Sequence, residues 1–190
     1  MQTIISCIQK ISPCKQSTID LLTSKMTRHE FPKKHILIKS GIIDKNFYFI
    51  EKGLTRSYCI INGEEATSWF SQEGDITFSM LSCYENKPGY EYVDLLEDSI
   101  IYSISIQELN KLYFDNIEIA NWSRLIHQKA FLDLELRHIA LATQSATERY
   151  HNFLKERSGL VNRVKLSHIA SFIGVSQVTL SRIRANYFLT

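Results

Sequence analysis

The hydrophobic pattern changes period near Pro32 and again near residue 105, and this constrains the fold more than any other feature. Between these points, short runs rich in β-branched and aromatic residues alternate with turns marked by glycine, asparagine and proline. The candidate strands are residues 35–39, 46–52, 54–61, 65–70, 90–96 and 99–105. Such strands indicate a closed or double-layered antiparallel structure: a barrel, a sandwich or a jelly roll. Asn62-Gly63 predicts a type I′ hairpin turn, because both central positions need positive φ.

Helical patterns flank this β-rich region. The first 30 residues carry apolar residues at helical spacing, so we expect them to be helical up to Pro32. Ser105 with Glu108, and Ser145 with Glu148, form the capping-box pattern that opens a helix. The sequence therefore predicts an α+β chain in three parts: a β-rich domain at 1–115, a long helix at 116–144 and a small helical domain at 145–190.

The long helix carries an apolar seam. It is predicted over roughly residues 116 to 143, and its seam of heptad character consists of Leu125, Leu132, Leu136 and Ile139. Lys129 and Thr143 interrupt the seam. A helix this long offers more face than one small domain usually covers, so we expect the seam to pair two copies of the chain. Packing of the helix on its own β-rich domain is the alternative.

Composition excludes several classes of protein. No apolar run approaches the ~18 residues of a membrane span, and the start of the chain does not have the pattern of a signal peptide. We therefore expect a cytoplasmic protein with no membrane partner. The four cysteines have no C-x-x-C spacing and the six histidines include no i, i+4 pair, so we expect neither an iron–sulfur cluster nor another metal site.

The motif that points most directly to a function lies at residues 166–184, LSHIASFIGVSQVTLSRIR. Apolar residues up to Ile173 share one helix face, Gly174 suits a left-handed C-cap, and Ser176 suits the N-cap of a second helix. This is the helix-turn-helix layout, whose second helix enters the major groove of DNA. The net charge of +2 also divides unevenly, since residues 149–190 carry +6. A basic unit favours a phosphate backbone, although a solvated basic face is the plain alternative.

Side chains on the second helix suit nucleic-acid contacts. Arginine can bond guanine bidentately and glutamine can bond adenine, whereas hydroxyl groups at a helix N-terminus suit phosphates. The predicted base-reading residues are Gln177, Val178, Ser181 and Arg182, and the predicted phosphate contacts are Ser176, Thr179, Arg184 and Lys165.

Two other classes of function fit the sequence less well. An enzyme of the cupin type would need histidine ligands, yet residues 46–105 contain no histidine, and no nucleophile elbow, phosphate loop or pair of catalytic acids is found. We therefore expect no catalytic site. A small-molecule-sensing or protein-binding module that does not read DNA would lack basic residues on the second helix, which keeps Arg182 and Arg184.

The order of these parts, together with the stretches ERYHNFL and IASFIGVSQVTLSRIR, resembles the Crp/Fnr family of bacterial transcription regulators. The chain is most similar to the shorter, Bacteroidetes-type members, from about Phe31 to Arg184. The resemblance implies a cyclic-nucleotide-binding-like β-roll sensor domain, a dimerisation helix and a winged helix-turn-helix that reads a pseudo-palindromic operator as a homodimer. It also implies RNA polymerase and a small-molecule effector as partners, and it places the wing hairpin at residues 157–165.

Nucleotide-binding members of that family grip the cyclic phosphate with a Gly-Glu pair and an Arg-Ser pair. In this chain the corresponding positions hold Gly74, Asp75, Tyr90 and Glu91. Residues 74–98 carry a net charge of −5, and no arginine occurs between Arg56 and Arg124. A phosphodiester there would lack the fork of donors that arginine supplies. We therefore expect no cyclic nucleotide and no other cofactor; the pocket holds another ligand or none.

Overall fold

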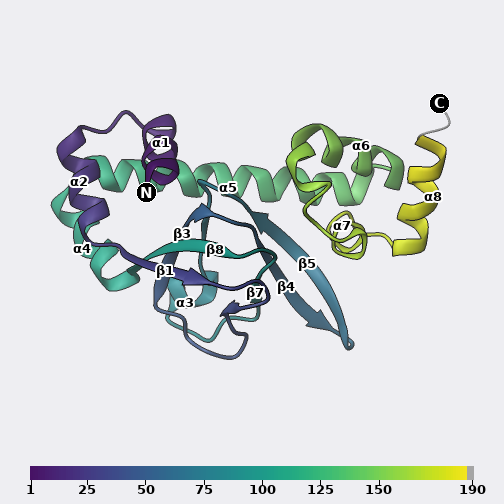
Figure 1. The fold of residues 1–190 in the computed structure, drawn as a ribbon, viewed down its shortest axis with the longest axis horizontal. Helices are drawn as coiled ribbons and strands as arrows, with labels where there is room; N and C mark the ends of the chain where they lie inside the picture. The colour runs from purple at the N-terminus through teal and green to yellow at the C-terminus, as the bar shows by residue number, and fades with distance from the viewer. Residues whose placement is uncertain (188–190) are drawn as a thin grey trace.

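A long helix forms one edge of the molecule, and the other parts are arranged along it (Figure 1). The computed structural model describes residues 1–187, so the last three residues of the predicted 145–190 domain lie outside the described residues. A β-roll lies beside the first part of the long helix, and a group of shorter helices packs at its far end. Two N-terminal helices pack around its start.

Eight strands build the roll. They are β1 (Thr27–Phe31), β2 (Ile36–Ile38), β3 (Asn46–Lys52), β4 (Thr55–Ile61), β5 (Glu64–Ser71), β6 (Ile76–Thr77), β7 (Tyr92–Leu95) and β8 (Ser99–Ser105). They form two four-stranded antiparallel sheets, with the orders β1-β8-β3-β6 and β2-β7-β4-β5. The double-layered antiparallel structure predicted from the strand spacing is therefore confirmed.

Apolar side chains from both sheets fill the interior of the roll. Ile50, Val93 and Ile101 are each 0% exposed there. Such β-branched residues suit strands, because their stiff side chains pack well on a pleated surface. Between β4 and β5 the chain turns at Asn62 and Gly63, whose φ angles of 53° and 84° confirm the predicted pair of positive φ values.

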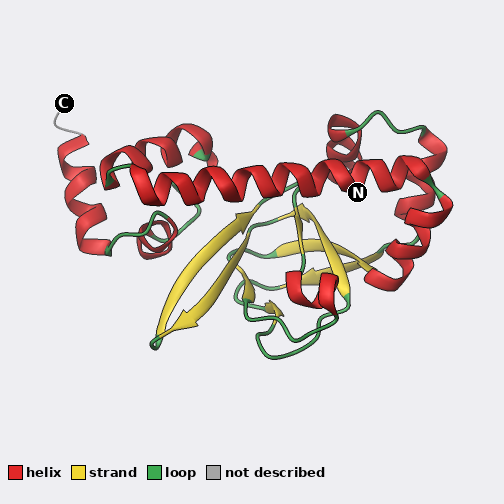
Figure 2. Cartoon of the chain, turned by 180° about the vertical axis from the view of Figure 1, so that it is seen from behind, coloured by secondary structure: helices red, strands yellow, loops and turns green. Residues whose placement is uncertain are grey.

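Most of the helices lie along one side of the roll and at both of its ends (Figure 2). They are α1 (Gln2–Ile11), α2 (Gln16–Ser24), α3 (Met80–Glu85), α4 (Ile106–Asp115), α5 (Ile117–Thr143), α6 (Ala146–Glu156), α7 (Leu166–Phe172) and α8 (Gln177–Tyr187). Both predicted caps are confirmed. The N–H of Glu108 donates to Ser105 Oγ at 3.1 Å, and Ser145 with Glu148 forms a complete capping box. The predicted long helix is α5, capped by the side chain of Asn116.

The sequence does not predict three elements of the roll: β1, β6 and α3. The expectation of a helical N-terminus up to Pro32 is wrong for residues 27–31, which form β1 and pair with β8 along their whole length. The segment TRHEF has no apolar alternation, so only its pairing with a distant strand makes it extended. The short β6 and α3 lie between predicted strands and have too few residues to show a period.

The predicted wing hairpin is absent from residues 157–165. This segment is a 3₁₀ helix (Ser158–Leu160) followed by turns, and it contains no strand. Leu160 is buried in an apolar core, and Arg163 forms ion pairs with Glu73 and Glu97 at 2.8 and 2.7 Å. The segment is thus folded against the roll, and the expectation of a winged unit at this place is wrong.

A second apolar core joins the roll to the C-terminal helices. Leu54 and Phe70 from the roll pack there with Tyr150 and Phe153 of α6 and with Leu180 of α8, and each is at most 3% exposed. The C-terminal helices are therefore held by the roll as well as by α5. Within residues 1–187, no helix combines the length and the apolar character that crossing a membrane requires.

Candidate nucleic-acid interface

A tight turn at Gly174 joins α7 to α8. Gly174 has a φ of +71°, a left-handed conformation that costs other residues about 1–2 kcal/mol. The N–H of Val175 donates to the carbonyl of Ala170 at 3.0 Å within this turn. Ala170 of α7 and Leu180 of α8 are both buried, at 1% and 0% exposed. The small side chain of Ala170 lets the two helices pack closely. The predicted pair of helices with a glycine turn is confirmed.

Ser176 precedes α8 and caps it as predicted. Its Oγ accepts a hydrogen bond from the N–H of Thr179 at 3.1 Å and lies 2.9 Å from the hydroxyl oxygen of Thr179. Both side chains are exposed. The first N–H groups of a helix have no partner inside the helix, and together with the helix dipole they attract anions. The N-terminus of α8 is therefore an exposed place that suits a phosphate.

The predicted base-reading side chains lie on the free face of α8. Gln177, Val178, Ser181 and Arg182 are all exposed, and Val178, at 62%, and Arg182 lie on the side opposite the buried Leu180. Figure 1 shows α8 at one end of the molecule, with no other element outside it. Of the predicted phosphate contacts, Lys165 is exposed just before α7 and Arg184 is half-buried. The structure thus brings the predicted DNA contacts together around α7 and α8.

The C-terminal helices use part of their positive charge internally. Arg149 donates to backbone carbonyls around the α7–α8 turn, and Arg157 packs over aromatic rings. Arg163 bonds Glu97 and Glu73, and these hydrogen bonds raise its pKa. Only part of the +6 charge is therefore available to contact a phosphate backbone. The cations of this region outside these internal contacts are Lys155, Lys165, Arg182 and Arg184.

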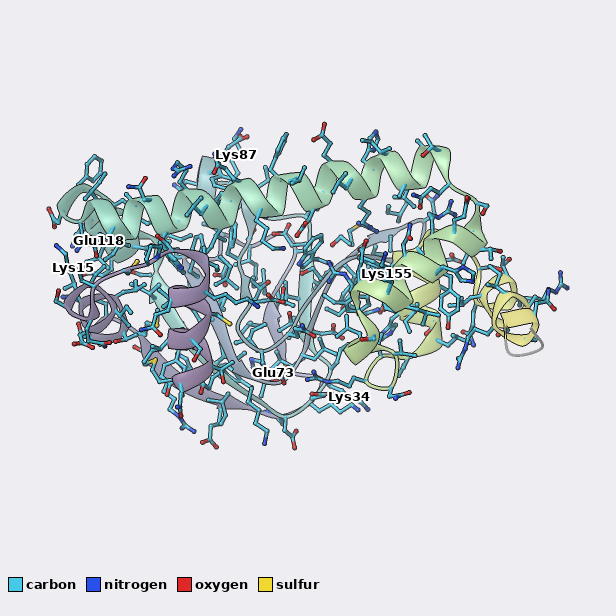
Figure 3. All side chains as sticks on the ribbon, turned by 90° about the horizontal axis from the view of Figure 1, so that it is seen from above. Lys15, Lys34, Glu73, Lys87, Glu118 and Lys155 are labelled. Carbon is cyan, nitrogen blue, oxygen red and sulfur yellow. The ribbon has the colours of Figure 1, made fainter. Side chains whose placement is uncertain are left out.

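One side of α5 has no other element beside it for most of its length (Figure 3). Leu132, Leu136 and Ile139 of the predicted seam are 51%, 56% and 48% exposed there, and Leu125 is half-buried. The chain's own roll does not cover these three side chains, so the seam is available to another surface.

Exposed apolar side chains also lie on other sides of α5, outside the predicted seam. Phe131, Leu134 and Leu141 are 69%, 39% and 41% exposed. They fall outside the heptad spacing on which the prediction rests. A count of apolar residues on every side of the helix, rather than along one seam, would have found them.

The four residues assigned to a ligand pocket lie in different surroundings. Gly74 and Asp75 form part of a turn, where the Asp75 carboxylate accepts from the N–H of Gln72 at 2.9 Å and burial raises its pKa. Tyr90 is 56% exposed, whereas Glu91 is only 7% exposed. One carboxylate oxygen of Glu91 accepts from the N–H of Tyr90 at 3.1 Å; the other is buried and has no hydrogen-bond partner in the part of the chain that is described.

The roll matches a known domain family. Residues 28–116 match the family model described as the cyclic nucleotide-binding domain, a stretch that includes nearly all of β1 and extends through α4. These residues, which form most of the roll together with α3 and α4, are similar to that domain family. The name of this family model describes a family of domains and does not say which ligand this chain binds. No curated protein matches the chain significantly.

Solved structures of bacterial regulators share the fold of the roll and of the helices that follow it. FixK2 from Bradyrhizobium japonicum is 16% identical with a TM-score of 0.77, over 86% of this chain and 85% of that one. The c-di-GMP-responsive global regulator CLP of Xanthomonas campestris is 17% identical with a TM-score of 0.76, over 92% of each chain. A protein of Eubacterium rectale described as a regulator of the crp/fnr family is 15% identical with a TM-score of 0.71, over 95% and 88%. At these identities, the likeness shows a common fold.

Acidic groups lie in the roll around Glu91. Glu91 is a buried carboxylate at a position where, by the resemblance to the Crp/Fnr family, a phosphate-binding residue is expected. Ser79 lies close to Glu91, and its buried hydroxyl has no hydrogen-bond partner among residues 1–187. The pKa of Asp44 is raised by burial and, to a smaller degree, by the charge of Glu91. Two acids in this interior would repel a phosphodiester, because charges interact more strongly away from water.

Proposed function

We propose that this protein is a sequence-specific DNA-binding transcription regulator of the Crp/Fnr type. The observation that carries the proposal is the free face of α8. Arg182 is exposed on it, opposite the buried Leu180, and Gln177 is exposed at the first turn of the same helix. A helix that only stabilised the fold would not need a polar, hydrogen-bonding face at the outer end of the molecule.

The side chains of this face suit the major groove. Arg182 can bond guanine O6 and N7, and Gln177 can bond adenine N6 and N7. Ser176, Thr179, Arg184 and Lys165 surround the same helix and suit the phosphates, with help from the N–H groups at the start of α8. The free methyl groups of Val178 suit the methyl group of thymine.

The exposed side of α5 supports a homodimer. Its apolar residues run along the helix that leads into the C-terminal unit, so pairing of two copies there would place two α8 helices on one side of the dimer. Dimers of this kind read two half-sites about one DNA turn apart, ~34 Å. The operator would then be pseudo-palindromic. RNA polymerase, as the resemblance implies, would be a further partner on the DNA.

We propose further that the regulator does not respond to cyclic AMP. The buried Glu91 and the absence of arginine from residues 57–123 support this. Any effector of the roll would then be a different small molecule, one that does not need a cation to hold a phosphate.

Substitution of Arg182 tests the proposal. Arg182→Ala should lose about 1–3 kcal/mol of discrimination between the operator and operators changed at one base pair. Lys155→Ala is the matched control, because it removes one exposed cation from α6, outside the predicted base contacts. It should weaken binding to all sequences by a similar factor. Competition binding with both variants measures this, and unchanged base preference in Arg182→Ala would contradict the assigned reading residue.

A further inference from the structure

The hairpin formed by β4 and β5 extends from the roll on the side of the C-terminal helices (Figure 2) and is bonded to α7. The hydroxyl of Ser171, on α7, accepts from the N–H of Thr67 at 2.8 Å and donates to the carbonyl of Glu65 at 3.0 Å. Both partners lie on β5. One side chain therefore makes two backbone hydrogen bonds that hold the hairpin against the first of the two helices.

A second side chain fixes the same contact from α5. Arg137 donates to the carbonyls of Ser68 and Thr67 on β5, at 2.8 and 3.3 Å, and to the carbonyl of Phe172 at the end of α7, at 2.9 Å. Its guanidinium group also lies 4.3 Å over the ring of Phe172. The long helix, the hairpin and α7 thus meet at one arginine, and a movement of any of them changes its hydrogen bonds.

The end of this hairpin is acidic and lies next to the start of α8. Glu64 and Glu65 line an open pocket together with Ser167, Ser171, Val175, Ser176 and Gln177. Both acids are exposed, and no lysine or arginine is among the residues that line the pocket. Glu65 is paired with Arg56 at 2.7 Å, a pairing made on the roll itself. A phosphate bound at Ser176 would therefore face two carboxylates on the other side of the pocket.

We propose that the docked β4–β5 hairpin is an autoinhibitory contact that lowers DNA affinity until the hairpin separates from α7. This inference rests on the proposed DNA-binding function of α8. The carboxylates of Glu64 and Glu65 repel the DNA backbone at the place where Ser176 and the α8 N-terminus attract it. Because β4 and β5 are also strands of the roll, a ligand that rearranges the roll would act on the same contact.

Neutralising the hairpin tests the electrostatic part of the proposal. In the full chain, Glu64→Gln with Glu65→Gln should bind the operator, selected from a random DNA pool, more tightly than the unaltered protein by about fivefold or more. The matched control is Glu85→Gln with Asp115→Asn, which removes two exposed acids from the ends of α3 and α4. The control should change affinity less than twofold, about what the altered net charge alone causes at moderate salt.

Hydrogen exchange at Thr67 tests the movement itself. Its N–H donates to Ser171, so its exchange should be slow in the free protein, and both operator binding and Ser171→Ala should accelerate it. Ser171→Ala should also tighten DNA binding. Two results together would overturn the inference and leave DNA binding standing. The N–H of Thr67 would exchange equally slowly with and without the operator, and the Glu64→Gln, Glu65→Gln variant would gain no more DNA affinity than its control. If no variant prefers any DNA sequence, the proposed function itself fails, and the inference fails with it.

Discussion

Gly174 carries the conformation on which the geometry of α7 and α8 depends. Its φ of +71° is left-handed, and an added Cβ would lie 2.9 Å from a terminal carbon of Leu141 on α5. The leucine side chain is partly exposed and can move, so the backbone conformation is the main obstacle to any other residue. This single position connects the sequence pattern to the relative placement of the two helices.

Replacing this glycine should therefore destabilise the protein. Gly174→Ala should lower the free energy of unfolding by about 1–2 kcal/mol, measured by urea denaturation at one fixed protein concentration. Gly159→Ala is the control, because an added Cβ there meets no atom within 4 Å. It should change stability by no more than about 0.5 kcal/mol. Equal losses in the two variants would contradict the role given to the turn.

His168 gives the contact between α7 and the roll a dependence on pH. Burial lowers its pKa, the charges of Arg56 and Lys165 lower it further, and Asp94 and Glu65 act in the opposite sense. The unfolded chain then binds more protons than the folded one below the ordinary histidine pKa of about 6.5. Stability should fall as pH drops through this range, and His168→Gln should make the dependence shallower. An unchanged slope in thermal melts between about pH 7 and 5 would show that His168 is not the cause.

Among the helices and strands, the local sequence pattern predicts the bounds of some elements correctly and fails to predict others. β3 and β8 lie where their runs of β-branched and aromatic residues place them, and α5 (Ile117–Thr143) lies where a long helix is predicted. β1 was not predictable, because its polar residues become a strand only by pairing with β8, more than 60 residues later. The stretch at 157–165 resembled a hairpin by family spacing alone, whereas its own residues bind the roll.

The exposed face of α5 predicts the behaviour of the protein in solution. Leu132→Asp with Leu136→Asp places two charges on that face, and the homodimer should dissociate at least about tenfold more readily. Ile42→Asp, at a 55% exposed position in the loop between β2 and β3, is the control and should leave the dimer intact. Analytical ultracentrifugation gives both results. A variant with the dimer mass of the unaltered protein, or an unaltered protein that is a monomer, would contradict the assignment of α5.

At the scale of the whole molecule, the packing of the C-terminal helices on the roll is the feature that sequence reasoning did not find. Arg163 bonds acids that lie 66 and 90 residues earlier in the chain, and Ser171 bonds β5 from more than 100 residues away. Such pairings leave no period or spacing in the sequence. The candidate DNA contacts stay predictions, whereas the turn at Gly174 and the cap at Ser176 were predictable because both are local features of one short motif.

The interior of the roll leads to a prediction for the whole protein. Isothermal titration with cyclic AMP should show no binding at micromolar concentrations, because the roll offers the buried carboxylate of Glu91 rather than an arginine. Glu91→Gln removes that charge without supplying an arginine, so it too should fail to bind tightly. A micromolar dissociation constant for the unaltered protein would contradict this account of the pocket.

If two copies of α8 read DNA together, as we propose, the protein should select its operator from a random DNA pool. Repeated rounds of selection should enrich a two-fold symmetric sequence with half-sites about 10 base pairs apart, and Arg182→Ala should lose preference at one symmetric pair of positions. A pool that stays random after repeated rounds, or an enriched sequence that Arg182→Ala selects equally well, would contradict it.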